Sequence, residues 1–329
     1  MKWAAIGLLL MGIASVFFLL QRNGPITAPA TSDSEVQTPV ESPIAPSQKS
    51  VPNPAAARIL LWGAYVGDDV ANGDAFERLV GASMKTRAIF VHWGNNKEFP
   101  KVLAAEVKKK GETLVIFWES MDYEVDTTSQ PRFSASSIAK GDWDAYIASF
   151  AATAKAYGAP VILIPFEEMK GNWYPWAGTV NGNSPEGVIA AYRHIHDLFS
   201  GVSNVKFGWD INEDSVPDTA ANVASAYYPG DDVVDYVGVD GFNDAEPWRG
   251  FSDIFSGPLE LLSRYDKPIF IFSFASAEGP QKAAWIREAL SAIKEDKRII
   301  GWLWFNENKE KDWRVNSSPS SLDAFRSSL

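Results

Sequence analysis

The chain has 329 residues, of which 46% are hydrophobic and 22% are charged, so it can bury a sizeable core in one large domain. Its formal net charge of −11 argues against binding to nucleic acid, to anionic lipid or to a strongly acidic polysaccharide. There is no cysteine, which excludes disulfides and thiolate metal sites. Aromatic residues make up 13% of the chain, a high share that favours a neutral partner recognised by stacking.

An apolar run of 18 residues, Trp3–Leu20, lies between Lys2 and Arg22. It is marginally long enough to span a bilayer, and no small-x-small cleavage site directly follows it. We predict a signal anchor over residues 1–23, with a cleaved signal peptide as the alternative. Residues 24–57 are rich in Pro, Ser, Thr and Ala and predict a flexible linker. Together they predict a domain anchored to the cell membrane outside the cytoplasm, periplasmic or extracellular, or alternatively secreted.

From residue 58 onward, predicted strands and helices alternate. The strands are Ile59–Tyr65, Arg87–His92, Thr113–Glu119, Pro160–Phe166, Val205–Asp210, Val233–Asp240, Lys267–Ser273 and Ile299–Phe305. The helices are Asp74–Ala82, Glu98–Lys110, Asp142–Tyr157, Ser184–Phe199, Gly257–Arg264, Gln281–Lys294 and Ser318–Ser328. This alternation predicts an α/β fold, a single (β/α)8 TIM barrel over residues 58–329. An open doubly wound sheet is the competitor, although no glycine-rich phosphate loop follows the first strand.

The most informative stretch follows the fourth predicted strand. Its apolar run, Pro160–Phe166, ends at two adjacent carboxylates, Glu167 and Glu168. Three aromatics in four residues come next, Trp173, Tyr174 and Trp176. Acid at the mouth of a buried strand, followed by flat aromatic surface, is typical of a site that cleaves sugars. The alternative is an acidic turn with aromatics packed beneath it.

In a barrel, the site lies at the C-terminal ends of the strands, and aromatic and polar residues alternate there. The candidates for substrate binding are His92, Trp93, Trp118, Trp173, Trp176, Asp240, Asn243 and Trp304, with core packing as the alternative for each tryptophan. We predict no metal and no cofactor, because His194 and His196, two apart on a helix, point to different faces. The predicted partner is a polysaccharide, not nucleic acid, and the chain is expected to be a monomer.

The stretch P-F-E-E-M-K-G-N-W-Y-P-W, residues 165–176, resembles the strand-four motif of glycoside hydrolase family 26. Tyr236–Asn243 and Trp304–Val315 are similar to the sixth- and eighth-strand regions of that family. The family includes β-mannanases and some β-glucanases and β-xylanases. The resemblance implies a retaining mechanism on a TIM barrel, with an acid/base glutamate after strand four and a nucleophilic glutamate after strand seven.

On this resemblance, Glu168 takes the position of the acid/base. A carboxyl group beside Trp173 and Trp176 is expected to be desolvated, with its pKa raised enough to hold a proton near neutral pH. Two neighbouring positions depart from the motif, because Glu167 replaces a histidine and Lys170 replaces an asparagine. Ser273 occupies the position of the nucleophile, where a neutral serine is a poor substitute for a carboxylate.

Three interpretations of Ser273 remain open. The serine is an engineered replacement of the glutamate, or the site is naturally rewired around a water activated by another carboxylate, or the barrel binds polysaccharide without cleaving it. Glu167 is the first candidate for a substitute carboxylate, beside Glu119, Asp210 and Asp240. The prediction is a hydrolase of a neutral β-linked polysaccharide, β-mannan or β-glucan, and the binding protein is the alternative.

Overall fold

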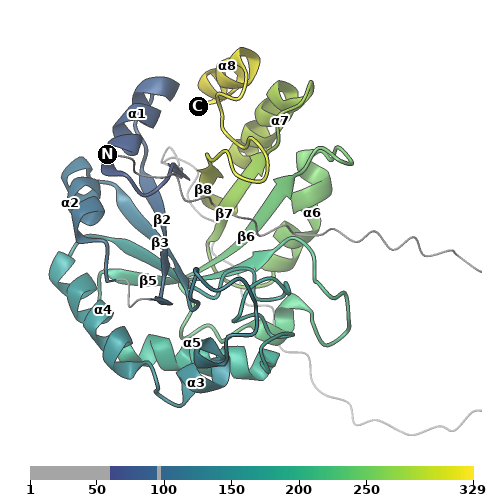
Figure 1. Ribbon diagram of the computed structural model, residues 1–329. Coiled ribbons are helices and arrows are strands. Elements are labelled where there is room, and N and C mark those ends of the chain that lie inside the picture. The colour runs from purple at the N-terminus through teal and green to yellow at the C-terminus, as the bar shows by residue number, and fades with distance from the viewer. Residues whose placement is uncertain (1–59, 95–97) are drawn as a thin grey trace, which may run out of the picture. The chain divides into compact units, whose positions relative to one another are not determined.

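The computed structural model describes residues 60–94 and 98–329, and within them parallel strands form a closed barrel (Figure 1). Each strand pairs with its neighbour in chain order, and β8 closes the barrel against β1. The strands are β1 (Leu61–Tyr65), β2 (Thr86–His92), β3 (Thr113–Glu119), β4 (Val161–Pro165), β5 (Val205–Asn212), β6 (Tyr236–Asn243), β7 (Ile269–Ser276) and β8 (Ile299–Phe305). The predicted (β/α)8 architecture is confirmed.

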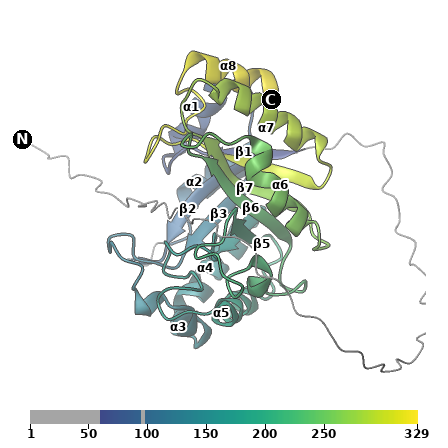
Figure 2. The ribbon, with the colours of Figure 1, turned by 90° about the vertical axis from the view of Figure 1, so that its right-hand side faces the viewer.

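The helices surround the barrel on its outside, as two perpendicular views show (Figures 1 and 2). They are α1 (Val70–Val80), α2 (Lys101–Lys110), α3 (Ala135–Ala139), α4 (Asp144–Tyr157), α5 (Pro185–Leu198), α6 (Phe251–Leu262), α7 (Lys282–Glu295) and α8 (Pro319–Ser328), with 3₁₀ turns η2 (Pro131–Phe133) and η3 (Ala224–Tyr227). Each helix predicted from the sequence is present. Helix α3, which is only five residues long, was not predicted from the sequence.

Local signals in the sequence fix most helix ends. The side chain of Ser184 accepts a hydrogen bond from the N–H of Gly187 at the start of α5, and Pro185 occupies the first turn. Gly111 and Gly158 end α2 and α4 in the left-handed conformation, with φ of 72° and 70°. These residues stop the helices before the chain turns back into β3 and β4.

Helix α6 differs most from its predicted start. It begins at Phe251 instead of Gly257, because the side chain of Asp253 accepts a hydrogen bond from the N–H of Gly250 and starts the helix there. Pro258, a residue that favours helix starts, lies inside α6. The local capping contact therefore decides the boundary.

Strands β5, β6 and β7 extend beyond their predicted ends, to Asn212, Asn243 and Ser276. The apolar runs stop earlier, but the backbone of these polar residues still pairs across the sheet: Asn212 with Asp240, and Asn243 with Ser276. The ends of three adjacent strands are therefore held in register where the barrel opens.

Side chains of the strands alternate between two buried layers. The inner layer fills the barrel axis and contains Ala88, Val115, Phe117, Ile162, Ile164, Phe270, Phe272 and Leu303. The outer layer lies between the strands and the helices. Gly238 makes room for the inner layer, because a Cβ atom there would lie 2.1 Å from the ring of Phe272.

The predicted signal anchor, residues 1–23, and the predicted linker, residues 24–57, lie outside the described residues. Among the helices of residues 60–94 and 98–329, none is long and apolar enough to cross a membrane. Membrane anchoring and location outside the cytoplasm stay predictions.

Candidate active site

The C-terminal ends of the parallel strands meet at one end of the barrel, which we call the mouth. Carboxyl groups from four consecutive strands collect there and are buried or half-buried. They belong to Glu119 at the end of β3, Glu167 and Glu168 after β4, Asp210 in β5 and Asp240 in β6. Their neighbour in β7 is Ser273.

Glu168 is half-buried in a strained backbone turn after β4. Both Phe166 and Glu168 have positive φ, 62° and 53°, which non-glycine residues seldom adopt outside functional turns. Its Oε2 accepts a hydrogen bond of 2.6 Å from Nε1 of Trp173, and its N–H donates to the carbonyl oxygen of Asp210. Burial raises the pKa of Glu168 to about 7, although the bond from Trp173 opposes this rise. A substantial fraction of this carboxyl group can therefore hold a proton near neutral pH.

Glu167 and Lys170, the two departures from the motif, are both buried. Neither carboxyl oxygen of Glu167 has a hydrogen-bond partner among the described residues. Burial, and then the nearby charge of Glu119, raise the pKa of Glu167 well above its usual range. Nζ of Lys170 donates to the carbonyl oxygen of Glu213 at 3.3 Å, and burial lowers the pKa of Lys170 to about 8. Burial thus favours the protonated form of Glu167 beneath the mouth.

Asp210 and Asp240 form a buried pair, here called the acid pair. They lie on neighbouring strands, and the interaction between them is one cause of the shift in their pKa values. No N–H or O–H group of the described residues donates to either carboxyl oxygen of Asp210 or to Oδ1 of Asp240. Burial raises the pKa of both groups well above the usual range. Burial therefore favours the protonated form of both groups.

Ser273 pairs in register with Asp240, at a bulge where the pairing of β7 with both neighbours shifts. It follows Phe272 of the inner layer and precedes Phe274 of the outer layer. Glu278, the next acid along the chain, bonds to Ser317. Glu278 therefore does not deliver a carboxylate to the position of Ser273.

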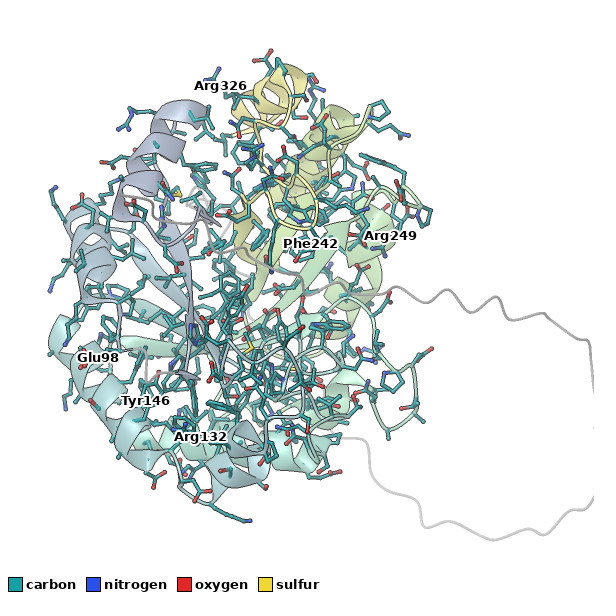
Figure 3. The ribbon with its side chains drawn as sticks, viewed as in Figure 1. Glu98, Arg132, Tyr146, Phe242, Arg249 and Arg326 are labelled. Atoms are coloured by element: carbon teal, nitrogen blue, oxygen red, sulfur yellow. The ribbon has the colours of Figure 1, made fainter. Side chains whose placement is uncertain are left out.

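Three expected sugar-binding residues, Trp93, Trp118 and Trp304, have no exposed surface. All three belong to the outer layer. Trp118 donates a hydrogen bond of 3.2 Å to Tyr146, which lies in the outer ring of helices (Figure 3). Trp304 packs on Trp285 of α7 at 6.2 Å. These rings pack in the core. Side chains alternate along a strand, so Trp118 and Trp304, which follow the inner residues Phe117 and Leu303, point away from the barrel axis.

Trp176 is fully buried as well, whereas Trp173 and Tyr174 are half-buried. The rings of Tyr174 and Trp176 stack at 4.3 Å with an interplanar angle of 13°, and Nε1 of Trp176 donates to the carbonyl oxygen of Glu167. Trp176 therefore supports the turn from below, and the ring surface that remains open belongs to Trp173 and Tyr174.

Asn243 is fully buried and organises the loop between β6 and α6. Its Oδ1 accepts hydrogen bonds from the N–H groups of Ala245 and Arg249, and its Nδ2 donates to Ser276. It is therefore not open to a ligand. His92 is half-buried at the end of β2, with its ring 5.8 Å from that of Tyr123.

Aromatic residues that were not predicted from the sequence to bind substrate also lie at the mouth. Tyr65 and Phe305 stack at 5.5 Å, and Phe242 meets Phe305 edge-on at 5.8 Å. Figure 3 shows Phe242 nearer the centre of the barrel than Arg249. Tyr123, after β3, is 46% exposed. These strand residues can be found by counting along each strand, because side chains two positions apart face the same side. Tyr65, Phe242 and Phe305 each lie an even number of positions from a residue of the same strand that faces the barrel axis.

Within the described residues, no three or more His, Cys, Asp or Glu side chains are arranged to hold a metal ion. His194 and His196 lie in α5. Nε2 of His194 lies 2.7 Å from a carboxyl oxygen of Asp144, at the start of α4. These two histidines are therefore part of the helical layer.

Comparison with curated proteins finds relatives that act on polysaccharides. Endoglucanase H of Acetivibrio thermocellus is 37% identical over 285 residues, covering 82% of this chain and 30% of that protein. The mannan endo-1,4-β-mannosidase of Bacillus subtilis is 29% identical over 172 residues, covering 50% of this chain and 43% of that protein. The chain spans less than half the length of the curated relatives that it matches.

Solved structures share the barrel. A family 26 β-mannanase from Bacteroides ovatus has a TM-score of 0.64 at 19% identity, covering 82% of this chain and 88% of that chain. The catalytic domain of an endo-β-1,4-mannanase from Bacillus sp. JAMB-750 has a TM-score of 0.65 at 18% identity, covering 82% and 85%. At these identities the likeness shows the fold alone.

The family itself is shown by the sequence of the barrel. Residues 117–316, more than half of the chain, match glycosyl hydrolase family 26. The matched range runs from the end of β3 to the loop after β8, so it includes the strand ends that carry Glu168, the acid pair and Ser273. The resemblance of the strand-four motif is thereby confirmed, and the chain belongs to glycosyl hydrolase family 26.

Proposed function

We propose that this protein hydrolyses a neutral β-linked polysaccharide, a β-mannan or a β-glucan, and that Glu168 is the proton donor. The observation that most supports this proposal is the pKa of Glu168, which burial at the end of β4 raises to about 7. A general acid works best when its pKa lies near the working pH. Family membership makes a glycosidic oxygen the acceptor of that proton.

The surroundings of Glu168 suit this role. Its Oε2 bonds to Trp173, which fixes the carboxyl group and leaves Oε1 for the departing oxygen. Its backbone is tied to Asp210 on β5, so the acid has a set position relative to the mouth. A positioned acid contributes about 10²–10⁴-fold to the rate of such a reaction.

The substrate class follows from charge and from aromatic surface. The net charge of −11 disfavours a polyanionic glycan, whereas the half-buried rings of Tyr65, Trp173, Tyr174 and Phe305 suit the apolar faces of neutral sugars. Endoglucanase H, at 37% identity, favours a β-glucan, and the B. subtilis mannosidase, at 29% identity, keeps β-mannan as the second choice. His92 and Tyr123 are further proposed contacts at the rim.

The alternative function is a barrel that binds polysaccharide without cleaving it. The observation that favours it is Ser273, which stands where the family resemblance implies a nucleophilic carboxylate. Both functions need the same aromatic surface, so binding alone does not separate them. Turnover does.

The test measures release of reducing ends from β-1,4-mannan, mixed-linkage β-glucan and β-1,3-glucan, together with affinity for each glycan. We expect hydrolysis of one glycan by the unaltered protein, and loss of most of that activity with little change of affinity in Glu168→Gln. Glu98→Gln, at an exposed surface ion pair, is the control and should keep full activity. Tight binding without turnover on any glycan establishes the alternative.

A further inference from the structure

We propose that Lys282, a buried lysine outside the mouth, is a positioning residue for glycan binding. It holds the backbone on both sides of Trp313, and the ring of Trp313 in turn supports Phe242 at the mouth. The inference rests on the proposed function and adds to it a residue that does not touch the glycan. Three sets of observations support it: the bonding of Lys282, the path of the loop after β8, and the ring contacts of Trp313.

Lys282 is the first residue of α7 and has no exposed surface. A positive charge is unfavourable at the N-terminus of a helix, because the helix dipole is positive there. Burial of an ammonium group also costs free energy unless the group is paired and hydrogen-bonded. The local preferences of α7 therefore disfavour a lysine at this position, so the reason for it lies in its contacts with other segments.

The ammonium group of Lys282 has three N–H donors, and three acceptors surround it. Its Nζ donates to the carbonyl oxygens of Asp312 at 3.1 Å and Arg314 at 2.8 Å, and to Oγ of Ser317 at 2.8 Å. The hydroxyl group of Ser317 donates to Glu278, whose Oε2 lies 3.9 Å from Nζ of Lys282. The buried charge is thus fully bonded, and all three acceptors belong to the loop between β8 and α8.

This loop, residues 306–318, crosses the C-terminal end of β7. At its start, the N–H of Asn306 donates to the carbonyl oxygen of Tyr65 in β1 at 2.9 Å. Further on, Nζ of Lys311 donates to the carbonyl oxygen of Asp244, just after β6, at 2.5 Å. Because β7 lies between β6 and β8 in the barrel, the loop passes over the end of β7 to reach Asp244. The loop therefore borders the mouth on the side of β7.

Trp313 lies between the two carbonyl groups that Lys282 holds, and it is buried. Its own carbonyl oxygen accepts a hydrogen bond of 3.0 Å from Nε1 of Trp304. Its N–H donates to the carbonyl oxygen of Glu307 at 2.9 Å. Three successive carbonyl groups, at positions 312, 313 and 314, are thus bonded to buried side chains, which fixes the backbone at Trp313.

The ring of Trp313 reaches the mouth through Phe242. The centroids of these two rings are 5.2 Å apart, and Phe242 meets Phe305 edge-on at 5.8 Å. Phe305 stacks on Tyr65, and both are among the rings that we propose to face the glycan. An aromatic ring contributes to sugar binding only when neighbouring groups hold it in place. Loss of the bonds from Lys282 should therefore be felt as weaker glycan binding.

The first test is the glycan affinity of Lys282→Met, measured with whichever of the three glycans named above the unaltered protein binds most tightly. Kd should rise about 2–10-fold, the value of one misplaced aromatic contact. KM should rise with it, whereas kcat should stay unchanged, because none of the contacts of Glu168 is altered.

Lys294→Met is the matched control for this test. Lys294 lies in the last turn of the same helix, just before β8 begins, and it also bonds to two backbone carbonyl groups, those of Ser328 and Leu329. These contacts hold the end of α8 instead of the loop at the mouth. The control should therefore keep the Kd of the unaltered protein.

The second test asks whether Lys282 acts through the ring of Phe242. Phe242→Leu removes the ring that Trp313 supports and should itself weaken binding. In that background, Lys282→Met should have little further effect on Kd, because both changes remove the same contact. Effects on Kd that add in full show that Lys282 does not act through Phe242, and they overturn the proposal.

Melting temperatures check that each variant folds. If Lys282→Met does not fold, Ser317→Ala takes its place, since it removes one acceptor, leaves the lysine intact and should raise Kd in the same direction. An unchanged Kd in the folded variant overturns the proposal and leaves the hydrolase standing. If the unaltered protein neither binds nor cleaves any of the three glycans, the proposed function itself fails, and this inference fails with it.

Discussion

Carboxyl groups gather at both ends of the barrel, but their surroundings differ. At the N-terminal end of the strands, Lys110 contacts Asp74 and lies 2.6 Å from Glu77, so both acids have a cation. At the mouth, the carboxyl oxygens of Glu167 have no hydrogen-bond partner among the described residues, and the same is true of both carboxyl oxygens of Asp210 and of Oδ1 of Asp240. Buried carboxyl groups without a cation cost stability, and a fold retains them where chemistry needs them.

The pKa of a carboxyl group does not by itself separate the two ends. Burial raises the pKa of Glu112 to about 7, as it does for Glu168. Glu112 directly precedes β3, at the end of the barrel away from the mouth, and lies 3.9 Å from Lys110. Position at the C-terminal ends of the strands is what identifies the site.

The largest effect is expected when substitutions of Glu168 and Glu112 are compared. Glu168→Gln should lower the rate on a substrate with a poor leaving group by about 10²–10⁴-fold, because the departing oxygen loses its proton donor. Glu112→Gln removes a carboxyl group of the same raised pKa and should leave kcat/KM unchanged. Initial rates from pH 5 to pH 9 check both, and in the unaltered protein activity should fall above pH 7 as Glu168 ionises. Equal losses in both variants would show that the effect is one of stability.

The next comparison sets a buried ring against an open one. Trp304→Ala should cost about 3–5 kcal/mol of unfolding free energy, because its ring packs on Phe274 and Phe325 with no exposed surface. Trp173→Ala should weaken glycan affinity with a much smaller loss of stability. Denaturant unfolding and binding isotherms separate the two outcomes. A loss of affinity in Trp304→Ala without destabilisation contradicts the packing assignment.

The sequence predicted the barrel well, because apolar runs and glycine stops are local signals. It predicted the β4 end for the same reason: Glu167, Glu168 and Trp173 follow one buried strand. It assigned Trp118 and Trp304 wrongly. In a strand that is apolar at every position, the sequence does not show which residues face the barrel axis and which face the helices. An alternating strand would have revealed it.

The acid pair was beyond prediction for a different reason. Asp210 and Asp240 were each visible as candidate bases, but their placement on neighbouring strands depends on the register of β5 with β6, and the pairing of Asp240 with Ser273 depends on a shift between β6 and β7. Irregularities of this kind re-aim single side chains and leave no mark in composition.

A smaller effect should appear in stability against pH at the mouth. The pKa of Glu167 is raised by burial in the folded protein, so its contribution is fully present below the unfolded pKa, about 4.3, and is lost as the pH rises. Glu167→Gln supplies the uncharged form at every pH. Its melting temperature should therefore exceed that of the unaltered protein at pH 8 and approach it at pH 4.5. Glu98→Gln controls for the loss of one surface charge, and a gain that does not vary with pH contradicts the assignment.

The smallest effect has the opposite sign and belongs to the other end of the barrel. The hydrogen bond and charge of Lys110 lower the pKa of Asp74, so its stabilisation is present above the unfolded pKa, about 3.9, and is lost as the pH falls through the lower folded value. Asp74 is half exposed, so Asp74→Asn should lower the melting temperature only slightly at pH 7 and low salt. That difference should shrink both in 1 M salt and toward pH 3. If the difference in melting temperature instead grows on acidification, the pKa of Asp74 is raised by burial, as that of Glu167 is. The two ends of the barrel would then not differ in this respect.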